Sequence, residues 1–295
     1  MYEILEKRLV AEKTEEIVVA APAIAAHAAA GQFVILRNRE EGERYPLTIA
    51  DYDPERGTVT LVFLEVGKST YELGQFETGD RVPDIVGPLG NPTEVRRGLH
   101  VVCIGGGVGI AAAHPVAKAF EAAGSRVTGI IGAKTADLLF YEDRMNAVCD
   151  RLIVTTDDGS RGQKGFVTNA LADLIEREGP DGMDEVFAVG PSVMMRAVAE
   201  ETRPRGIRTI VSLNPIMVDG TGMCGGCRVE VGGETKFACV DGPEFDAHQV
   251  DFDLLIARQQ MYRNVESQAM QECQLEEQID RAAADPNDTE RDTCE

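Results

Sequence analysis

The stretch H-V-V-C-I-G-G-G-V-G-I, residues 100–110, places a run of glycines directly after an apolar strand. The next residues, 111–124, have helical composition and end on a glycine, as helices commonly do. Glycines between a strand and a helix allow backbone amides to approach a pyrophosphate at the helix N-terminus. The stretch therefore favours a nucleotide site in an α/β fold, although a tight strand-to-helix turn needs such glycines too.

Buried strands continue to alternate with helical segments after this stretch. The predicted strands are R-V-T-G-I-I-G-A, R-L-I-V-T-T-D-D, E-V-F-A-V-G-P and R-T-I-V-S-L, and the helical segments include 166–177 and 193–203. This alternation predicts a doubly wound parallel sheet. Loops 155–166 and 189–195 follow two of the strands, at the edge where open α/β sheets bind ligands. Three loops at one edge strengthen the prediction of a nucleotide site.

Residues 1–97 have the pattern of a small antiparallel barrel. Runs rich in β-branched residues, such as E-E-I-V-V-A-A and T-V-T-L-V-F-L-E-V, are separated by turn signals such as D-P-E-R-G. Within this region, R-Y-P-L-T-I-A begins at Arg44 and V-G-K-S-T ends at Thr70. A guanidinium pairs well with phosphate, and Gly67, Ser69 and Thr70 offer amides and hydroxyls. These residues are candidates for a diphosphate site; alone, Arg44 has the simpler interpretation of a surface charge.

Three cysteines lie close together in the last third of the chain. D-G-T-G-M-C-G-G-C, residues 219–227, contains Cys224 and Cys227, and Cys239 follows after a short hairpin. Two cysteines separated by two residues, with glycines around them and a third cysteine nearby, describe a site for a thiolate-bound metal centre. A redox dithiol at Cys224 and Cys227 is the alternative, but it would leave Cys239 without a role. The pattern therefore points to electron transfer.

Composition and charge limit which partners the protein is expected to bind and in which compartment it is expected to be found. The 295 residues include 29 basic and 50 acidic ones, for a net charge of −21, whereas nucleic acids and anionic membranes bind basic surfaces. No apolar run reaches the roughly 20 residues of a spanning helix, and the start M-Y-E-I-L-E-K-R-L-V lacks the order of a signal peptide. We therefore expect a cytoplasmic protein that binds neither nucleic acid nor membrane, with reduced cysteines available for metal.

Five motifs occur in an order that resembles a known family. They are R-Y-P-L-T at 44–48, G-P-L-G at 87–90, the glycine run at 105, T-D-D-G-S at 156–160 and the cysteine loop. In this order they resemble the ferredoxin reductase-like flavoproteins, in the subgroup that ends in a 2Fe-2S domain. That subgroup contains the electron-transfer subunit of dihydroorotate dehydrogenase B and the small subunit of NADH-dependent ferredoxin:NADP oxidoreductase, also called the sulfide dehydrogenase small subunit.

The resemblance implies FAD, NAD(H) and a 2Fe-2S cluster as cofactors. NADP(H) stays open, because Lys134, Arg161 and Lys164 could meet a 2′-phosphate. FAD would lie between the barrel and the sheet, on Arg44, Pro46, Leu47, Thr48, Gly67, Ser69, Thr70 and the turn that begins at Gly87. The nicotinamide nucleotide would lie over Gly105, Gly106, Gly107, Gly109, Asp157, Asp158 and Gly190. No catalytic acid or base is expected, since passing electrons between these cofactors requires none.

The cysteine loop separates the two relatives within this subgroup. The dihydroorotate type has four cysteines, the first in an M-x-C-G arrangement, whereas this chain has M-V-D-G with Asp219 at that place. Asp219, Cys224, Cys227 and Cys239 are therefore the expected metal ligands, as in the ferredoxin:NADP oxidoreductase small subunit. Two alternatives stay open: a Cys3Asp zinc site, and a loop in which Asp219 only caps a turn.

The function that the resemblance implies is electron transfer between NAD(H), FAD, the cluster and a larger partner subunit. That partner would be a glutamate-synthase-like flavin and iron-sulfur protein in a heterodimer, with ferredoxin as an indirect partner. Alternatives are a subunit serving dihydroorotate dehydrogenase, sulfide dehydrogenase or a hydrogenase, and a zinc-stabilised nucleotide-binding regulatory module. The expected division is a β-barrel for FAD at 1–97, an NAD(P)-binding α/β domain at 98–212, a cluster segment at 213–255, and one helix followed by a disordered acidic tail at 256–295.

Overall fold

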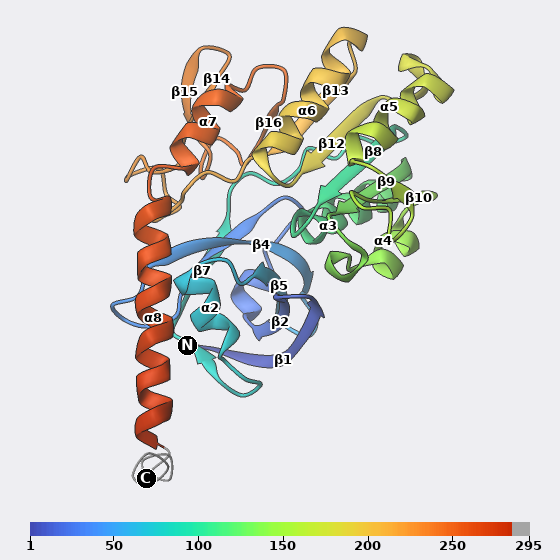
Figure 1. Ribbon diagram of the computed structural model, residues 1–295. Coiled ribbons are helices and arrows are strands. Elements are labelled where there is room, and N and C mark those ends of the chain that lie inside the picture. The colour runs from blue at the N-terminus through green and yellow to red at the C-terminus, as the bar shows by residue number, and fades with distance from the viewer. Residues whose placement is uncertain (285–295) are drawn as a thin grey trace, which may run out of the picture.

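The N-terminal part of the protein is the predicted antiparallel, barrel-like sheet. In this computed structural model, which describes residues 1–284, its strands follow the order β6-β1-β2-β5-β4-β3-β7, with every neighbouring pair antiparallel (Figure 1). Alternate strand residues such as Ile17, Val19 and Leu61 fill its interior, as the two-residue period of a strand requires. The elements are β1 (Tyr2–Ala11), β2 (Thr14–Ala20), α1 (Pro22–Ala25), β3 (Phe33–Arg37), β4 (Arg44–Asp53), β5 (Thr58–Leu64), α2 (Lys68–Gly74), β6 (Arg81–Val82) and β7 (Asp84–Leu89).

The middle of the chain forms the predicted parallel sheet. Its order is β11-β10-β9-β8-β12-β13-β16, and all neighbours are parallel except β13 and β16. Every residue of β8 is buried, which explains its nearly continuous apolar sequence. The elements are β8 (His100–Gly106), α3 (Gly109–Ala122), β9 (Arg126–Ala133), a 3-10 turn (Ala136–Leu138), α4 (Glu142–Val148), β10 (Arg151–Thr156), β11 (Gln163–Lys164), α5 (Val167–Glu178), a 3-10 turn (Pro180–Gly182), β12 (Glu185–Val189), α6 (Ser192–Thr202), a 3-10 turn (Arg203–Arg205) and β13 (Arg208–Ser212).

The strand order of this sheet defines where a ligand can bind. The chain proceeds from β8 outward through β9 to β10, and then crosses back to place β12 on the other side of β8. The order therefore reverses between β8 and β12, and open α/β sheets bind ligands at the carboxyl ends of the strands at such a point. This is the edge at which the glycine run lies.

The segment after β13 is joined to the parallel sheet. It contains a small hairpin, β14 (Arg228–Val231) and β15 (Glu234–Phe237), and then β16 (Glu244–Asp246), which pairs antiparallel with β13. Met217, Cys227 and Cys239 lie in one buried apolar cluster with residues of the parallel sheet and with Phe33 and Ile35 of the barrel. The segment thus packs against both larger units.

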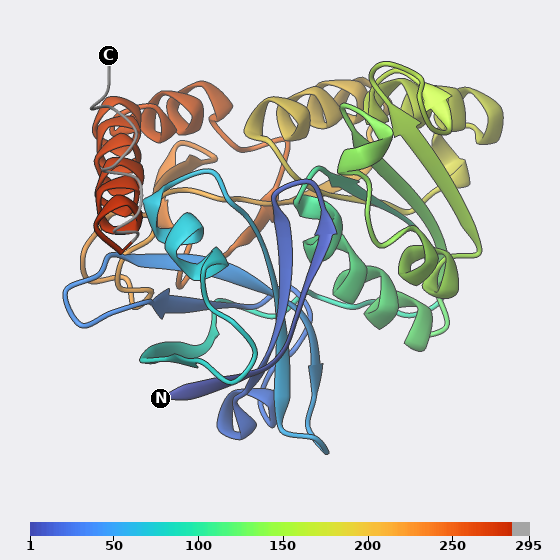
Figure 2. The ribbon, with the colours of Figure 1, turned by 60° about the horizontal axis from the view of Figure 1, so that its bottom comes forward.

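Two helices, α7 (Phe252–Gln259) and α8 (Arg263–Ala284), follow Asp251, so the prediction of one helix and a disordered tail is wrong for the described residues. Gln260, Met261 and Tyr262 interrupt the helix, and α8 then runs beside α2 along the barrel (Figure 2). The polar composition of α8 does not prevent order, because its apolar residues recur every three or four positions and can share one face. The acidic end, 285–295, lies outside the described residues. None of the helices that the structure describes is long and apolar enough to cross a membrane.

Candidate functional site

The predicted flavin residues of β4 lie in two different environments. Leu47 packs against the buried core of the barrel, whereas Arg44 and Pro46 line a cavity outside that core. Thr48 does not line this cavity; it is paired with Phe33 on β3, and Phe33 is paired on its other side with Leu89. The motif therefore runs from the cavity at Arg44 to the part of the sheet where β4 and β3 pair beside Leu89 of the G-P-L-G turn.

A hydrogen-bonded chain fixes β4 against the start of α2. The Tyr45 hydroxyl donates to Oδ1 of Asn38 (2.5 Å), and Nδ2 of Asn38 donates to the backbone oxygen of Ser69 (2.6 Å). Burial raises the pKa of Tyr45, so the phenol stays a donor. The Thr70 hydroxyl accepts from the amide of Gly67 (3.3 Å). These bonds hold the predicted diphosphate residues in a defined loop, and Asn38 is a contributor that sequence reasoning missed.

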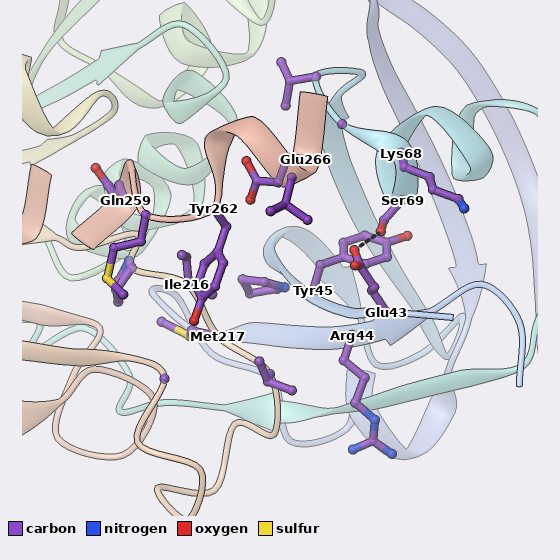
Figure 3. A pocket seen from close by; sticks show the side chains of 18 of the residues that line it. Glu43, Arg44, Tyr45, Lys68, Ser69, Ile216, Met217, Gln259, Tyr262 and Glu266 are labelled. Carbon is purple, nitrogen blue, oxygen red and sulfur yellow. Dashed lines mark hydrogen bonds between the residues drawn. The ribbon is translucent and has the colours of Figure 1, made fainter. Parts of the chain in front are cut away.

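The cavity has a volume of about 630 Å³ and lies between the barrel and the C-terminal helices (Figure 3). One side consists of residues 43–46, at and just before the start of β4, and of residues 66–70, at and just before the start of α2. The other side consists of the segment 215–218 and of residues from α7, α8 and the turn between them. A cavity of this size fits part of a dinucleotide.

The predicted nucleotide residues gather at the carboxyl edge of the parallel sheet. A Cβ atom at Gly109 would lie 2.4 Å from the backbone oxygen of Val189, so only glycine lets α3 start this close to β12. Gly107 has a positive φ of 55° and open space above it. Gly107 is therefore the glycine of this run at which the backbone is open, whereas Gly105, Gly106, Gly109 and Gly190 are buried and allow close packing at the switch point of the sheet.

The acidic loop after β10 is tied to the same edge. The amide of Asp157 donates to the oxygen of Ala133 (3.1 Å), and the amide of Gly107 donates to Gly132 (2.8 Å), so both loops adjoin the end of β9. Oδ1 of Asp158 accepts from the hydroxyl (2.7 Å) and the amide (2.9 Å) of Ser160, which lowers the pKa of Asp158. The carboxylate of Asp158 thus shapes the loop, while the side chain of Asp157 is exposed.

The cysteine loop, residues 219–227, brings Cys227 together with Cys239. The Sγ atoms of these two predicted ligands lie 3.2 Å apart, and both residues are buried. Burial and the Cys227 thiol raise the pKa of Cys239 to about 12. A metal ion would displace these thiol protons, since thiolates are the ligating form.

The other two predicted ligands are less buried than this pair. Cys224 is exposed, and its Sγ accepts from the amide of Gly226 (3.4 Å). Asp219 accepts from the amides of Thr221 (2.7 Å) and Cys224 (2.7 Å), which lowers the pKa of its carboxyl. Among the described residues, no three His, Cys, Asp or Glu side chains stand close enough together to bind one ion.

The donor set nevertheless suits an iron-sulfur centre in its chemistry. Cys227 and Cys239 are a buried thiol pair, and Cys224 lies three residues from Cys227 on a glycine-rich loop. Backbone amides of such a loop can donate to cluster sulfurs. Asp219 acts as a turn cap in this structure, but each carboxylate oxygen that accepts one amide keeps a further acceptor position.

The cysteine loop is in contact with the G-P-L-G turn, residues 87–90. Gly220 packs against the side chain of Leu89, and the amide of Asn91 donates to the oxygen of Gly242 (2.7 Å). On the other side, Nη2 of Arg258 donates to the oxygen of Gly226 (3.1 Å). The cysteine loop is therefore held between the barrel and α7.

Comparison with known proteins agrees with this arrangement. Residues 214–251 match the model of the iron-sulfur cluster binding domain of dihydroorotate dehydrogenase B. A Thermotoga maritima protein named as a homolog of the dihydroorotate dehydrogenase B (NAD(+)) electron transfer subunit is 48% identical over 265 residues, which cover 90% of this chain and 92% of that protein. The corresponding electron transfer subunit of Bacillus caldolyticus is 34% identical, over 84% of this chain and 96% of its own. The chain belongs to the dihydroorotate dehydrogenase B electron-transfer subunit family.

A solved structure extends the match to the whole fold. The NADH-dependent reduced ferredoxin-NADP oxidoreductase structure, described for flavin-based electron bifurcation, has a chain 46% identical to this one, with a TM-score of 0.87 over 93% of this chain and 98% of that chain. The predicted family and oxidoreductase class are thereby confirmed, and so at family level is the cofactor set of FAD, a 2Fe-2S cluster and NAD(H). Membership in the electron-transfer subunit family does not favour the zinc module.

Proposed function

We propose that this chain is the electron-transfer subunit of a larger oxidoreductase and passes electrons between NAD(H), FAD and a 2Fe-2S cluster. The observation that carries this proposal is the contact of Gly220 in the cysteine loop with Leu89 in the G-P-L-G turn. This contact places the loop that contains the predicted cluster ligands directly against the turn that is predicted to border the flavin. The reversal of strand order between β8 and β12 would place a nucleotide site on the same chain.

The chain's residues would act by binding and orientation. Arg44, Ser69 and Thr70 would hold the diphosphate, and the strand-to-helix turn from Gly105 to Gly109 would hold the nucleotide. When bound, FAD would supply the exchange between the two-electron chemistry of a hydride and the one-electron chemistry of a cluster. Cys224, Cys227 and Cys239 would bind the cluster with Asp219 as the fourth ligand. Because Cys224 is exposed in this structure, its side chain would have to turn toward the thiol pair.

The partner that we propose is a larger flavin and iron-sulfur subunit of the glutamate-synthase-like type, in a heterodimer. Support comes from the 46% identical chain, which belongs to a ferredoxin-NADP oxidoreductase studied for electron bifurcation. Ferredoxin would then be an indirect partner, served through the larger subunit. Asp219 at the place of the first cysteine separates this assembly from the dihydroorotate type.

The test is purification of the full chain followed by analysis of flavin, iron, sulfide and zinc. We expect FAD together with iron and sulfide in equal amounts, and bleaching of the flavin absorbance when NADH is added. A colourless protein that contains zinc and does not respond to NADH would overturn the proposal. Affinity purification from the native host with mass spectrometry then tests the partner, and recovery of a dihydroorotate dehydrogenase subunit would contradict the partner assignment.

A further inference from the structure

The cavity beside the barrel has one side that the sequence motifs do not explain. Residues 261–269 contribute five cavity-lining residues, which we name the C-terminal wall: Met261, Tyr262, Val265, Glu266 and Ala269. The wall lies across the cavity from the predicted diphosphate residues, and Figure 3 shows Tyr262 and Glu266 on this side. No flavin or nucleotide motif includes any of them.

The C-terminal wall exposes several apolar side chains. Tyr262 is 52% exposed and Val265 is 65% exposed, and Val66 on the opposite side of the cavity is 74% exposed. Apolar side chains gathered around a concave site indicate a ligand that covers them. A flat apolar ring would bury this surface.

The residues that line the cavity indicate which half of the flavin cofactor it holds. Arg44, Gly67, Ser69 and Thr70, the predicted diphosphate residues, all line it. Thr48, Gly87 and the glycines of the nucleotide edge do not. Since hydride transfer requires the flavin ring to meet the nicotinamide at that edge, the reacting ring of a bound flavin would lie outside this cavity. The cavity is therefore left for the diphosphate and the half of the cofactor beyond it.

The chemistry of the C-terminal wall matches an adenosine. An aromatic ring such as Tyr262 stacks on a nucleobase. A carboxylate such as Glu266 accepts hydrogen bonds from ribose hydroxyls, as acidic residues do in dinucleotide sites. The same carboxylate would repel the terminal phosphate of FMN, which carries more negative charge than a phosphate within FAD.

We propose that the C-terminal wall is the adenosine subsite of the flavin site, so that Tyr262 and Glu266 select FAD over FMN. This inference rests on the proposed flavin function. It gives a specific role to the turn between α7 and α8 and to the first turns of α8.

The test is titration of the flavin-free full chain with FAD and with FMN, followed by flavin fluorescence. In Tyr262→Ala we expect FAD to bind about tenfold more weakly, the loss typical for removal of one aromatic stacking partner, while FMN binds as in the wild type. Tyr262→Phe keeps the ring and should keep FAD affinity. In Glu266→Gln the ratio of FAD to FMN affinity should fall. The matched control is Leu275→Ala, an exposed apolar residue of the same helix that does not line the cavity.

The outcomes separate this inference from the proposed function. An equal loss for FAD and FMN in Tyr262→Ala, or no loss for either, would overturn the adenosine subsite. A loss in Leu275→Ala equal to that in Tyr262→Ala would also overturn it, because the effect would then belong to the helix as a whole. Failure of the wild-type chain to bind any flavin would instead contradict the proposed function.

Discussion

Gly220 lies so close to Leu89 that a Cβ atom at position 220 would be 2.6 Å from Cδ1 of the leucine. Gly220 also has a positive φ of 76°, a conformation that side chains disfavour. The close contact joins the cysteine loop to the G-P-L-G turn through the side chain of Leu89 alone, because Gly220 has none. Any substitution at position 220 must therefore separate the two predicted redox sites or distort one of them.

Gly220→Ala should consequently lower both stability and cluster content. Backbone strain costs about 1–2 kcal/mol, and overpacking against Leu89 adds about 1–3 kcal/mol. Gly233→Ala is the matched control, since Gly233 has a similar φ of 77° but a Cβ atom added there would meet no other atom within 4 Å. Urea unfolding and iron analysis of both variants measure the difference. Equal destabilisation and equal iron content in the two variants would show that the contact with Leu89 has no energetic role.

Asp219 can be tested as a ligand separately from its role as a turn cap. Asp219→Asn keeps a side chain that caps turns nearly as well as aspartate but lacks the negative charge. We expect Asp219→Ala to lose the cluster or its stability, and Asp219→Cys to retain it with a shifted reduction potential. Electron paramagnetic resonance of the reduced proteins reports cluster content, and the same signal followed in a redox titration reports the potential. A wild-type spectrum in Asp219→Ala or Asp219→Asn would leave only the capping role.

The architecture was predictable because its signals are local. The glycines at 105–109 fit a strand-to-helix turn with close backbone approach, and β8, β9, β10, β12 and β13 all appear as apolar runs in the sequence. The spacing of Cys224 and Cys227 likewise indicated a metal site without any tertiary information. The short hairpin between Cys227 and Cys239 is a local feature too, and it brings the two cysteines together in the fold.

The C-terminal wall was missed because its role depends on distant parts of the chain. Tyr262, Val265, Ala269 and Cys273 follow one another at intervals of three and four residues, a helical apolar stripe that was readable in the sequence. The cavity's opposite side comes from the barrel, about 200 residues earlier, and no local pattern reveals that proximity. Leu47 shows the same limitation within a motif, since only the strand register assigns its side chain to the barrel core.

Glu16 links the barrel to the parallel-sheet domain, and its removal should weaken that link. Its carboxylate is buried, accepts from the Tyr141 hydroxyl and from Nε of Arg8 (2.6 Å), and lies 3.2 Å from Nη1 of Arg144. Burial first, and then the bond to Glu16, raise the pKa of Tyr141, so the phenol remains a donor. We expect Glu16→Gln to lower the free energy of unfolding by about 2 kcal/mol. This loss is smaller than that from breaking a fully buried ion pair, because both arginines are partly exposed.

A double-mutant cycle measures this link. Tyr141→Phe should cost about 1–2 kcal/mol, and the double variant should lose roughly 1 kcal/mol less than the sum of the two. Glu6→Gln is the control, because the Glu6–Arg56 pair is exposed on both sides and contributes little. Additive losses in urea unfolding would show that Glu16 and Tyr141 act independently.

Glu244 should make the stability of the protein fall as pH rises toward neutrality. It lies where β16 meets the barrel, and its Oε1 accepts from the Thr93 hydroxyl (2.6 Å). Burial raises its pKa from 4.5 to about 7, with a smaller contribution in the same direction from Glu185. The folded protein holds this proton more tightly than the unfolded chain does. The stabilisation that protonated Glu244 provides is therefore complete below pH 4.5 and is lost as pH rises through about 7.

Glu244→Gln keeps the acceptor for Thr93 and removes the charge, so it should be more stable than the wild type at pH 8. The expected gain is about 2 kcal/mol, below the full linkage value because the residue retains some solvent contact. At pH 4.5 the two proteins should unfold at nearly the same urea concentration. Glu40→Gln, a substitution at an exposed position of the barrel, serves as the control, and its stability relative to the wild type should not depend on pH in this way. An equal difference between Glu244→Gln and wild type at both pH values would contradict the assignment of this titration to Glu244.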